Sequence, residues 1–316
     1  MPLDPQCKAI IDAAAAAGGA PFDQNDHIAS RKSYAGTTAI YRHSCGPLDA
    51  IENTQFPGPA GTVPVRIYRP DHDNGGPALP CLVFFHGGGW VVGDLDTHDH
   101  MCRHLAHGAN IVVVAVDYRL APEHKFPAAL DDCCAAVRWV ANEAGTLNID
   151  GSCIAVGGDS AGGNLAAAVS IAMRDTQGPE IKLQLLIYPA VDFTADNDSL
   201  HENGDGYLLT RAAIEMFADL YLPNRESRSD PRASPQLRSN HANLPRAFIQ
   251  TAEFDPLRDE GRAYAESLMA AGCPVEYKCY PGVVHGFARM CARVDAAVIA
   301  LDNACGVLRE AFGIKN

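Results

Sequence analysis

The chain has 316 residues, of which 47% are hydrophobic and 20% charged, the composition of an ordinary globular protein that can bury a large core. A formal net charge of -13 and the lack of a basic stripe argue against nucleic-acid partners, which require clustered Lys and Arg to replace counterions. The eleven scattered cysteines contain no C-x-x-C pair, which favours mostly buried free thiols over a disulfide framework and indicates a reducing compartment.

The N-terminal region has neither the basic start nor the unbroken apolar core of a signal peptide. No run approaches the roughly 18 apolar residues that indicate a membrane span. Residues 1–50 instead read as an Ala-rich helix followed by a polar, Gly-containing stretch without a strand pattern. We therefore expect a cytoplasmic protein without membrane association, whose first 50 residues are an addition to the main fold.

From about residue 62 onward, short β-branched runs alternate with longer helical patterns, which is typical of a mostly parallel sheet covered by helices. Several runs are apolar nearly throughout, as strands covered on both faces must be. The predicted strands are Val63–Tyr68, Cys81–Phe85, Ile111–Val116, Cys153–Val156, Leu183–Tyr188, Ala247–Ala252 and Val275–Tyr280. The predicted helices are His98–His107, Ala128–Ala144, Gly162–Arg174, Asp259–Ala271 and Met290–Phe312. The fold class is therefore α/β.

Besides residues 1–50, a second stretch lacks the alternation of strand and helix patterns. It runs from residue 192 to about 240, where turn-rich polar sequence surrounds one helical segment, Thr210–Leu222. Two additions that are distant in sequence can form a single lid if they meet in space. The predicted organisation is a lid made of residues 1–50 and 192–230, and a core made of residues 51–191 and 231–316.

The segment Gly158-Asp-Ser160-Ala-Gly162 follows a predicted strand and precedes a helical pattern. A nucleophile on so tight a strand-to-helix turn needs small neighbours two residues to either side, which the two glycines supply. The turn also places Ser160 near a helix N-terminus, where backbone N–H groups favour developing negative charge. A plain glycine-rich turn would share this pattern, whereas a dinucleotide site needs a different glycine spacing. Ser160 is the predicted nucleophile.

A serine hydroxyl needs a general base, and in this architecture the base is a histidine that comes last in the chain, after an acid. Three histidines follow Ser160. His285 lies in a glycine-flanked loop just past the last predicted strand, from which it could reach over the sheet edge. His201 and His241 lie in or near the second addition and are expected at the surface. His285 is the predicted base.

The acid that orients the base is expected at the carboxyl end of a strand, where open α/β sheets place their active sites. Asp255 directly follows the strand predicted at 247–252 and precedes a proline. Asp259 and Glu260 fall in the first turn of the next helix, where acids are stabilised by the helix dipole. Glu253 is the main competitor, because a strand end can shift by a residue or two. Asp255 is the favoured acid.

Acyl transfer also needs N–H donors for the oxyanion of the tetrahedral intermediate. The run His86-Gly-Gly-Gly-Trp90 leaves a strand into three consecutive glycines, which can bring backbone very close to a substrate carbonyl. A flexible turn would show the same glycines, but a loop that is needed only for flexibility would not require the flanking His86 and Trp90. The predicted donors are the N–H groups of Gly88, Gly89 and Ala161.

With these motifs, together with Asp255-Pro-Leu-Arg-Asp-Glu260 and His285-Gly-Phe287 in this order, the chain resembles the hormone-sensitive-lipase-like family of α/β-hydrolases, specifically its bacterial esterases with GDSAG at the elbow. The resemblance covers nearly the whole chain and includes Asp117-Tyr-Arg-Leu-Ala-Pro-Glu123. One departure is that Gly282 is followed by two valines where the family commonly has Gly-Met.

The resemblance implies an eight-stranded mixed sheet with a helical cap, the latter built from the N-terminal segment and an insertion after the sixth strand. It implies hydrolysis of short- to medium-chain acyl esters by water without metal or cofactor, and it assigns the triad to Ser160, Asp255 and His285. The last strand, at 275–280, is expected at a sheet edge, and an exposed edge invites a homodimer, which the family makes more plausible.

Apolar residues of the cap that face the elbow should set the acyl-chain length. Phe22, Leu208, Leu209 and Phe217 are the candidates, although each could equally pack the cap on itself. Trp90 could contact substrate or pack beneath the oxyanion loop. Amides, peptides and lactones are alternative substrates, because they share the acyl-enzyme route. A non-catalytic binding protein is a further alternative, but neither the serine nor the histidine is missing.

A different type of site is suggested by the histidines of residues 98–107. His100 and His104 share a helix face, and His107 lies one turn further on, so metal binding is geometrically possible. There is no H-E-x-x-H, however, and no second cluster of ligands to close a site. A solvated helix face is the preferred interpretation, and no metal is expected.

Overall fold

The computed structural model describes residues 1–18, 26–71 and 76–314. Its centre is a single eight-stranded sheet in the order β1-β2-β4-β3-β5-β6-β7-β8. The β1–β2 and β2–β4 pairs are antiparallel and all others are parallel. The strands are β1 (Leu48–Gly58), β2 (Gly61–Pro70), β3 (Leu79–Phe85), β4 (Val112–Val116), β5 (Ile149–Asp159), β6 (Ile181–Ile187), β7 (Arg246–Phe254) and β8 (Val275–Val284). The predicted mostly parallel eight-stranded sheet is confirmed.

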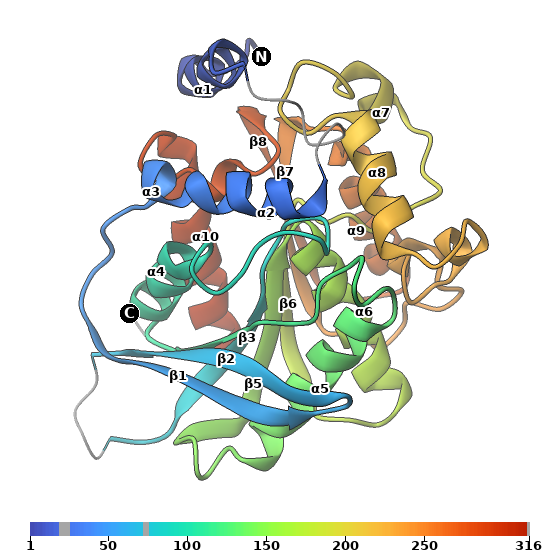
Figure 1. Cartoon of the computed structure of the whole chain (residues 1–316). Coiled ribbons are helices and arrows are strands. Elements are labelled where there is room, and N and C mark those ends of the chain that lie inside the picture. Colours follow the sequence, from blue (N-terminus) through green and yellow to red (C-terminus); the bar gives the residue numbers. More distant parts are fainter. Residues whose placement is uncertain (19–25, 72–75, 315–316) are drawn as a thin grey trace.

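Helices cover both faces of this sheet (Figure 1). The helices that pack on one face are α5 (Ala128–Asn142), α6 (Ala161–Asp175) and α9 (Arg258–Ala270), while α4 (Asp99–Ala109) and α10 (Asp295–Phe312) pack on the other. Neighbouring strand residues divide between the two cores: Val83 and Phe85 lie on the α5–α6 side, Leu82 and Phe84 on the α4–α10 side. This alternation is why the central strands are apolar throughout.

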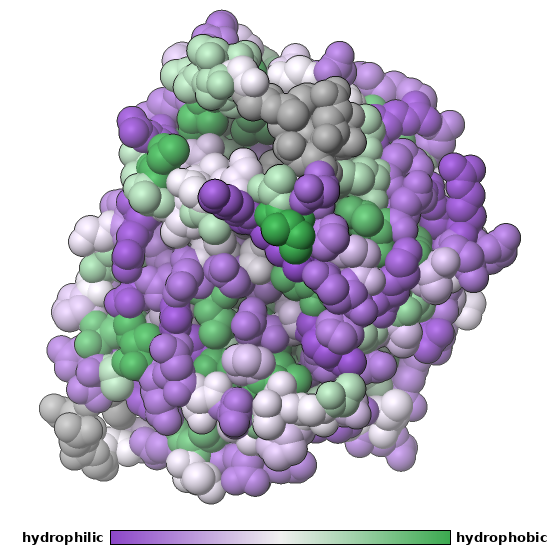
Figure 2. All heavy atoms as spheres, in the orientation of Figure 1, coloured by the Kyte–Doolittle hydropathy of each residue, from purple (hydrophilic) through white to green (hydrophobic). Residues whose placement is uncertain are grey.

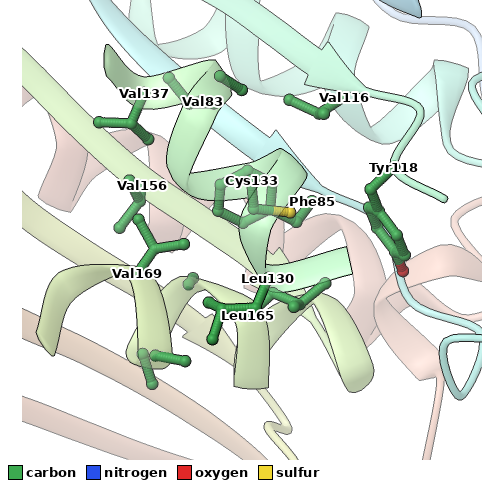
Figure 3. Packing of buried hydrophobic residues seen from close by; sticks show 14 of the residues in the cluster. Val83, Phe85, Val116, Tyr118, Leu130, Cys133, Val137, Val156, Leu165 and Val169 are labelled. Carbon is green, nitrogen blue, oxygen red and sulfur yellow. The ribbon is translucent and has the colours of Figure 1, made fainter. Parts of the chain in front are cut away.

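The core on the α5–α6 side is built from aliphatic side chains of alternate strand residues and one stripe of each helix (Figure 3). In that view Cys133 of α5 lies close to Phe85, Val137 of α5 lies close to Val83, and Leu130 of α5 lies close to Leu165 of α6. All of these side chains are at most 5% exposed. Burying such a side chain stabilises the fold by about 1.5–3 kcal/mol, so this layer holds α6 firmly against the strand that precedes it.

The remaining helices lie over the carboxyl ends of the parallel strands (Figure 1). They are α1 (Pro5–Ala16), α2 (His27–Gly36) and α3 (Thr38–Tyr41) from the N-terminal segment, and α7 (Asp198–Glu202) and α8 (Arg211–Tyr221) from the segment after β6. Both segments border one cavity, described below. The two additions expected from the sequence therefore do meet in space.

Two elements differ from the sequence-based expectations. The strand β1 was not predicted, because only Phe56 of its eleven residues is buried and the run lacks a hydrophobic pattern. It forms through a hairpin with β2. The helix expected from Met290 begins only at Asp295: Phe287–Arg289 form a 3₁₀ turn, and Ala292 N–H donates to the Tyr41 carbonyl instead of continuing a helix. The apolar spacing of residues 290–294 reflects packing against α3.

The cysteines are all free, and most are buried, as predicted. Burial raises the pKa of the Cys7 thiol to about 11 and that of Cys305 to about 12, so both are unreactive thiols at neutral pH.

None of the described helices is long and apolar enough to cross a membrane. On the face shown in Figure 2, hydrophobic residues are dispersed among hydrophilic ones, as on most protein surfaces.

The expectation of a solvated histidine face on α4 holds for His107, which is exposed, but was wrong for His98 and His100. His98 and His100 are 1% exposed, because α4 is packed between the sheet and α10. His104 lies 2.8 Å from Asp302 of α10. Among the described residues, no group of three or more His, Cys, Asp or Glu side chains is arranged to hold a metal.

His241, expected at the surface, is only 8% exposed and hydrogen-bonds to the Pro235 carbonyl. The reason is that the loop after η3 (Pro235–Leu237) folds back against α9.

The burial of His100 predicts a pH effect on stability. Its Nε2 lies 2.8 Å from the Arg289 carbonyl, which can only accept, so Nε2 carries a proton, while Nδ1 is buried without a hydrogen-bond partner among the described residues. Burial lowers the pKa of His100 from its usual value of 6.5 to about 4. The unfolded chain therefore binds this proton first, and the stability that His100 contributes is present above pH 6.5 and is lost as pH falls toward 4.

We accordingly expect the stability difference between wild type and His100→Gln, measured by urea unfolding, to shrink by about 2 kcal/mol between pH 7 and pH 4.5. Groups elsewhere titrate equally in both proteins and cancel in the difference. A difference that stays constant over this range would show that His100 is not held neutral by burial.

Candidate active site

Ser160 occupies the turn between β5 and α6. Its φ of 56° and ψ of -118° lie in a region that non-glycine residues rarely adopt and that stores strain. The turn is held in place by the Ser160 N–H, which donates to the Ile187 carbonyl at 2.8 Å. At the start of α6, the Asn164 N–H donates to the Ser160 carbonyl. The side chain of Ser160 thus stands at the carboxyl end of the sheet.

The flanking glycines are required by close approach of backbone. A Cβ on Gly162 would collide with the Phe85 carbonyl oxygen, and a Cβ on Gly158 would collide with the same oxygen and with the Gly162 backbone. The strand, the turn and the first helical residues therefore press directly on the end of β3. This contact sets the distance between the serine and the loop that follows Phe85.

Gly162→Ala is expected to lower the free energy of unfolding by at least about 3 kcal/mol, because the obstacle is rigid backbone of a central strand. Gly306→Ala in α10 is the matched control: no atom lies within 4 Å of its added Cβ, and removing a helical glycine should stabilise by up to about 1 kcal/mol. Urea unfolding should show a lower free energy of unfolding for Gly162→Ala and an unchanged or higher one for Gly306→Ala. Equal stabilities would contradict the crowding inferred at Gly162.

His285 and Asp255 reach Ser160 from two different loops. His285 Nε2 lies 2.9 Å from Ser160 Oγ, and His285 Nδ1 lies 2.7 Å from Asp255 Oδ2. Asp255 is fully buried, and its Oδ1 accepts the Leu257 N–H at 2.8 Å. A carboxylate so placed holds Nδ1 in its protonated form and leaves Nε2 free to accept a proton from the serine.

Glu253, the competing acid, is turned away from this group. Its carboxylate pairs with the N-terminal ammonium group and accepts the Gly282 N–H at 2.7 Å. These contacts lower the pKa of Glu253, the N-terminus being the larger cause. His201 is likewise remote: it is exposed and pairs with Asp196. The structure thus brings together Ser160, Asp255 and His285.

The loop after β3 lies beside the serine. Gly88 and Gly89 have φ values of 125° and 58°, which favour glycine. The Gly88 carbonyl accepts the N–H groups of Val91 and Val92, which closes the loop. Within the part of the chain that the structure describes, no acceptor is recorded for the N–H groups of Gly88, Gly89 or Ala161. Gly88, Gly89 and Ser160 border the same cavity.

Asp159 joins this loop to the elbow, a role that the sequence analysis missed. Its Oδ1 accepts the Gly87 N–H at 2.8 Å and lies 3.2 Å from His98 Nε2. Burial raises the pKa of Asp159, but the charge of His98 and the Gly87 N–H outweigh burial, so the pKa lies below its usual value. The sequence shows an aspartate between Gly158 and Ser160. It does not show the partners of this side chain, because they come from distant segments of the chain.

Glu260 fixes a third segment of the site. Its carboxylate is buried, and its Oε1 accepts the Val191 N–H at 2.6 Å. Burial raises the pKa of Glu260 well above its usual value. The sequence placed Glu260 in the first turn of a helix, which is correct for α9, but not its contact with the loop after β6. That loop also approaches the Ser160 carbonyl through the Ala190 N–H.

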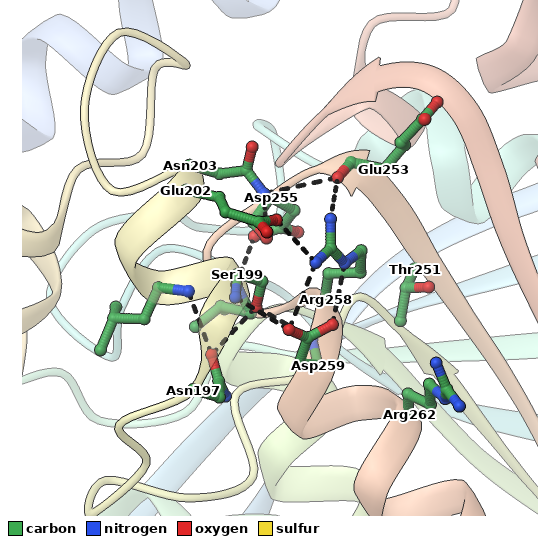
Figure 4. A network of polar contacts seen from close by, with 12 residues as sticks. Asn197, Ser199, Glu202, Asn203, Thr251, Glu253, Asp255, Arg258, Asp259 and Arg262 are labelled. Atoms are coloured by element: carbon green, nitrogen blue, oxygen red, sulfur yellow. Dashed lines mark hydrogen bonds and ion pairs between the residues drawn. The ribbon is translucent and has the colours of Figure 1, made fainter. Parts of the chain in front are cut away.

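The segment with α7 is fastened to the loop that carries Asp255 (Figure 4). Ser199 Oγ donates to the Pro256 carbonyl at 2.9 Å, and the Ser199 N–H donates to Asp259 Oδ2 at 2.8 Å. Arg258 bridges Asp259 and Glu202. The segment that covers the site and the strand end that carries the acid therefore form one polar network.

A cavity of about 1100 Å³ opens over Ser160 and His285. It is bordered by Leu208, Leu209 and Phe217 from the segment after β6, and by alanines of α1. The ring of Phe217 lies against Gly89, where a Cβ would collide with it. Phe22, the fourth predicted specificity residue, lies outside the described residues. The volume suits a ligand of drug-like size.

Trp90 packs against the covering helix α8, and its contact with substrate stays a prediction. It is 3% exposed and stacks on Tyr221 of α8 with ring centroids 4.4 Å apart and planes at 6°, and it also borders the cavity. Stacked aromatic pairs contribute about 0.5–1.5 kcal/mol beyond the area that they bury. The end of the oxyanion loop is thereby attached to the covering helix.

Comparisons with known proteins identify a family and several relatives of this chain. A family model described as alpha/beta hydrolase fold matches residues 82–289. Carboxylic ester hydrolase LipN of Mycobacterium tuberculosis is 44% identical over 298 residues, covering 90% of this chain and 77% of that protein. Ethyl acetate hydrolase of Pseudomonas putida is 38% identical over 305 residues, covering 94% and 95% of the two chains.

Solved structures show the same arrangement over almost the full length. An ester hydrolase from the metagenome of Lake Arreo superposes with a TM-score of 0.94 at 40% identity, covering 98% of this chain and 99% of that one. A hyperthermophilic esterase from Pyrobaculum calidifontis superposes with a TM-score of 0.93 at 38% identity, with the same coverage. Since the family model extends from the strand before the glycine loop to the loop that carries His285, the chain belongs to the α/β-hydrolase family.

Proposed function

We propose that this protein is a serine carboxylesterase of the hormone-sensitive-lipase-like group, and that it hydrolyses short- to medium-chain acyl esters through an acyl-enzyme. Carboxylic ester hydrolysis is the activity in the names of its relatives. The observation that carries the proposal for this chain is the hydrogen-bonded series from Ser160 through His285 to Asp255 at the floor of the cavity.

In the first half of the proposed reaction, His285 Nε2 takes the proton of Ser160 Oγ as that oxygen attacks the ester carbonyl carbon. The negative charge moves to the carbonyl oxygen, where the N–H groups of Gly88, Gly89 and Ala161 stabilise it. The C–O bond to the alcohol then breaks, and His285 gives its proton to the departing alkoxide. The acyl group remains on Ser160.

In the second half, a water molecule gives a proton to His285 and attacks the acyl carbon. The second tetrahedral intermediate uses the same three N–H donors. Its collapse returns the proton to Ser160 and releases the carboxylic acid. The reactants are an acyl ester and water. All of the proposed catalytic groups, namely the triad and the three N–H donors, belong to this chain.

The covering helices complete the proposal. Residues 1–50 and 192–230 would act as one cap, with residues 51–191 and 231–316 as the catalytic core. Leu208, Leu209 and Phe217 would then limit the length of the acyl chain. The edge position of β8 supports the further proposal of a homodimer that pairs this strand with its copy.

The proposal is tested with p-nitrophenyl esters from acetyl to palmitoyl, assayed beside p-nitroanilides of the same acids. We expect hydrolysis of the esters, fastest for short and medium chains, and slow or no release from the anilides. Intact-protein mass after rapid quenching should show one added acyl group, which peptide mapping should locate at Ser160. A folded protein that acts on no ester, or that prefers the anilides, would contradict the proposal.

A further inference from the structure

Arg289 is a buried cation in the wall of the active-site cavity. It lies in the 3₁₀ turn η4 (Phe287–Arg289), shortly after His285, and is 5% exposed. No other Lys or Arg among the described residues is as buried. Guanidinium groups stay charged in proteins, so burying one without an ion pair is costly unless a ligand or another group compensates for the charge.

The groups that contact Arg289 are neutral. Its guanidinium lies 3.9 Å from the ring centroid of Tyr34 and 5.6 Å from that of Tyr41, and it donates to Thr37 Oγ1. Cation–π contacts of this type offset part of the desolvation. Within the described residues, no carboxylate lies within the 4.0 Å of an ion pair with Arg289.

The acids that border the cavity are engaged elsewhere. Glu215 pairs with Arg228 at 2.8 Å, and Asp192 accepts the Thr194 N–H. Glu260 accepts the Val191 N–H, and Asp159 accepts the Gly87 N–H. Arg289 does lower the pKa of Asp159 through its charge, so Asp159 compensates it in part, from outside contact distance. The positive charge of Arg289 therefore acts on the cavity.

A second cation extends this side of the cavity toward solvent. Arg293 is exposed, also borders the cavity, and lowers the pKa of Tyr41 together with Arg289, against the larger effect of burial. Two further arginines, Arg211 and Arg228, border the cavity from the segment with α8, beside apolar residues such as Leu209 and Phe217. Arg228 is neutralised by Glu215 and Asp219, whereas Arg289 is buried without an ion pair among the described residues.

From the burial of this guanidinium in the cavity wall among neutral neighbours, we propose that Arg289 is a specificity residue that binds a carboxylate on the substrate, so that the preferred substrates are esters that carry a free carboxylate away from the bond to be cleaved. This inference rests on the proposed esterase function and refines its substrate class. The overall negative charge of the protein repels anions, so a preference for them must come from local groups.

The test uses two matched pairs of esters that differ in one charged group: monoethyl adipate and its terminal amide, and 4-acetoxybutanoate and its amide. The first pair carries the carboxylate in the acyl half, and the second carries it in the alcohol half. For at least one pair, wild-type kcat/KM should be about 10- to 100-fold higher for the acid, because hydrogen bonds to charged groups have this strength.

Arg289→Gln should bring that ratio to one or below, and Arg289→Lys should retain part of it. Arg262→Gln removes the same charge from an exposed site on α9 and should leave the ratio unchanged. If Arg289 only braces α2 and α3 against the core, Arg289→Gln will slow both members of a pair equally. An unchanged ratio in that variant, or a wild type with no preference in either pair, overturns the proposal.

Binding to Ser160→Ala, measured by calorimetry with the same pairs, separates this proposal from the esterase function. Tighter binding of the acid, lost in Ser160→Ala/Arg289→Gln, supports the carboxylate site even if no ester is hydrolysed. Hydrolysis of the amides without any preference for the acids supports the esterase function and rejects the carboxylate site. The Tm of each variant shows whether it is folded.

Discussion

Replacing Ser160 with alanine is expected to lower kcat for p-nitrophenyl acetate by about 10⁴- to 10⁶-fold. Among the described residues, Ser160 is the one whose hydroxyl lies 2.9 Å from His285 Nε2, so the variant lacks the group that would carry the acyl chain. Any activity that remains would come from the oxyanion donors and a water molecule activated by His285. Alanine can replace serine in the turn without a new clash, and we expect Tm to change by only a few degrees.

Ser170→Ala is the matched control for this variant. Ser170 lies on the same helix, is 1% exposed, and donates only to the Ala166 carbonyl of the preceding turn. Its removal should change kcat by less than about threefold, since the bond is local to α6. If Ser160→Ala were folded and retained more than about a hundredth of wild-type kcat, another nucleophile would have to be sought in the cavity.

Asp255→Asn is expected to lower kcat by about 10³- to 10⁴-fold. An asparagine would keep its oxygen on the Leu257 N–H and present its NH₂ group to His285 Nδ1. The imidazole would then carry its proton on Nε2 and could not accept the proton of Ser160. Because the exchange is nearly isosteric, substrate binding should change far less than kcat.

Glu253→Gln tests the acid that the sequence left as a competitor. Its carboxylate contacts the N-terminus and Gly282 rather than His285. We expect kcat to change by less than about threefold, with a small loss of stability from the exposed ion pair. A loss of activity in Glu253→Gln similar to that in Asp255→Asn would show that the hydrogen-bonded arrangement differs in the working enzyme. Steady-state kinetics of both variants at pH 7 distinguish the two acids.

Glycines of the loop after β3 and of the elbow pack closely against other segments at the edge of the cavity. Gly162 packs on the Phe85 carbonyl, Gly87 on Asp159, and Gly89 on the Phe217 ring. Each contact joins two of the three segments that meet at the serine: the end of β3, the elbow and α8. In the proposed mechanism, preorganised N–H donors stabilise developing charge without reorganisation, and these contacts would hold the donors in position.

Much of the fold was predictable because it depends on neighbours in sequence. The buried strands are apolar throughout, and the elbow glycines stand two residues from Ser160, so both are recognisable without tertiary information. The chain order of Ser160, Asp255 and His285 follows from the same architecture. The strand β1 was missed because its stability comes from hairpin pairing with β2 rather than from a hydrophobic face.

The sequence by itself determined the sheet, the elbow, the glycine loop and the three residues that meet at Ser160, since local backbone preferences and periodic burial are encoded within a few residues. Only the tertiary structure decided that His98, His100 and His241 are buried, that Trp90 stacks on Tyr221, and that Arg289 stands in the cavity wall with neutral neighbours. Burial, stacking and charge compensation depend on contacts between separate helices, strands and loops, which no pattern within a few residues can show.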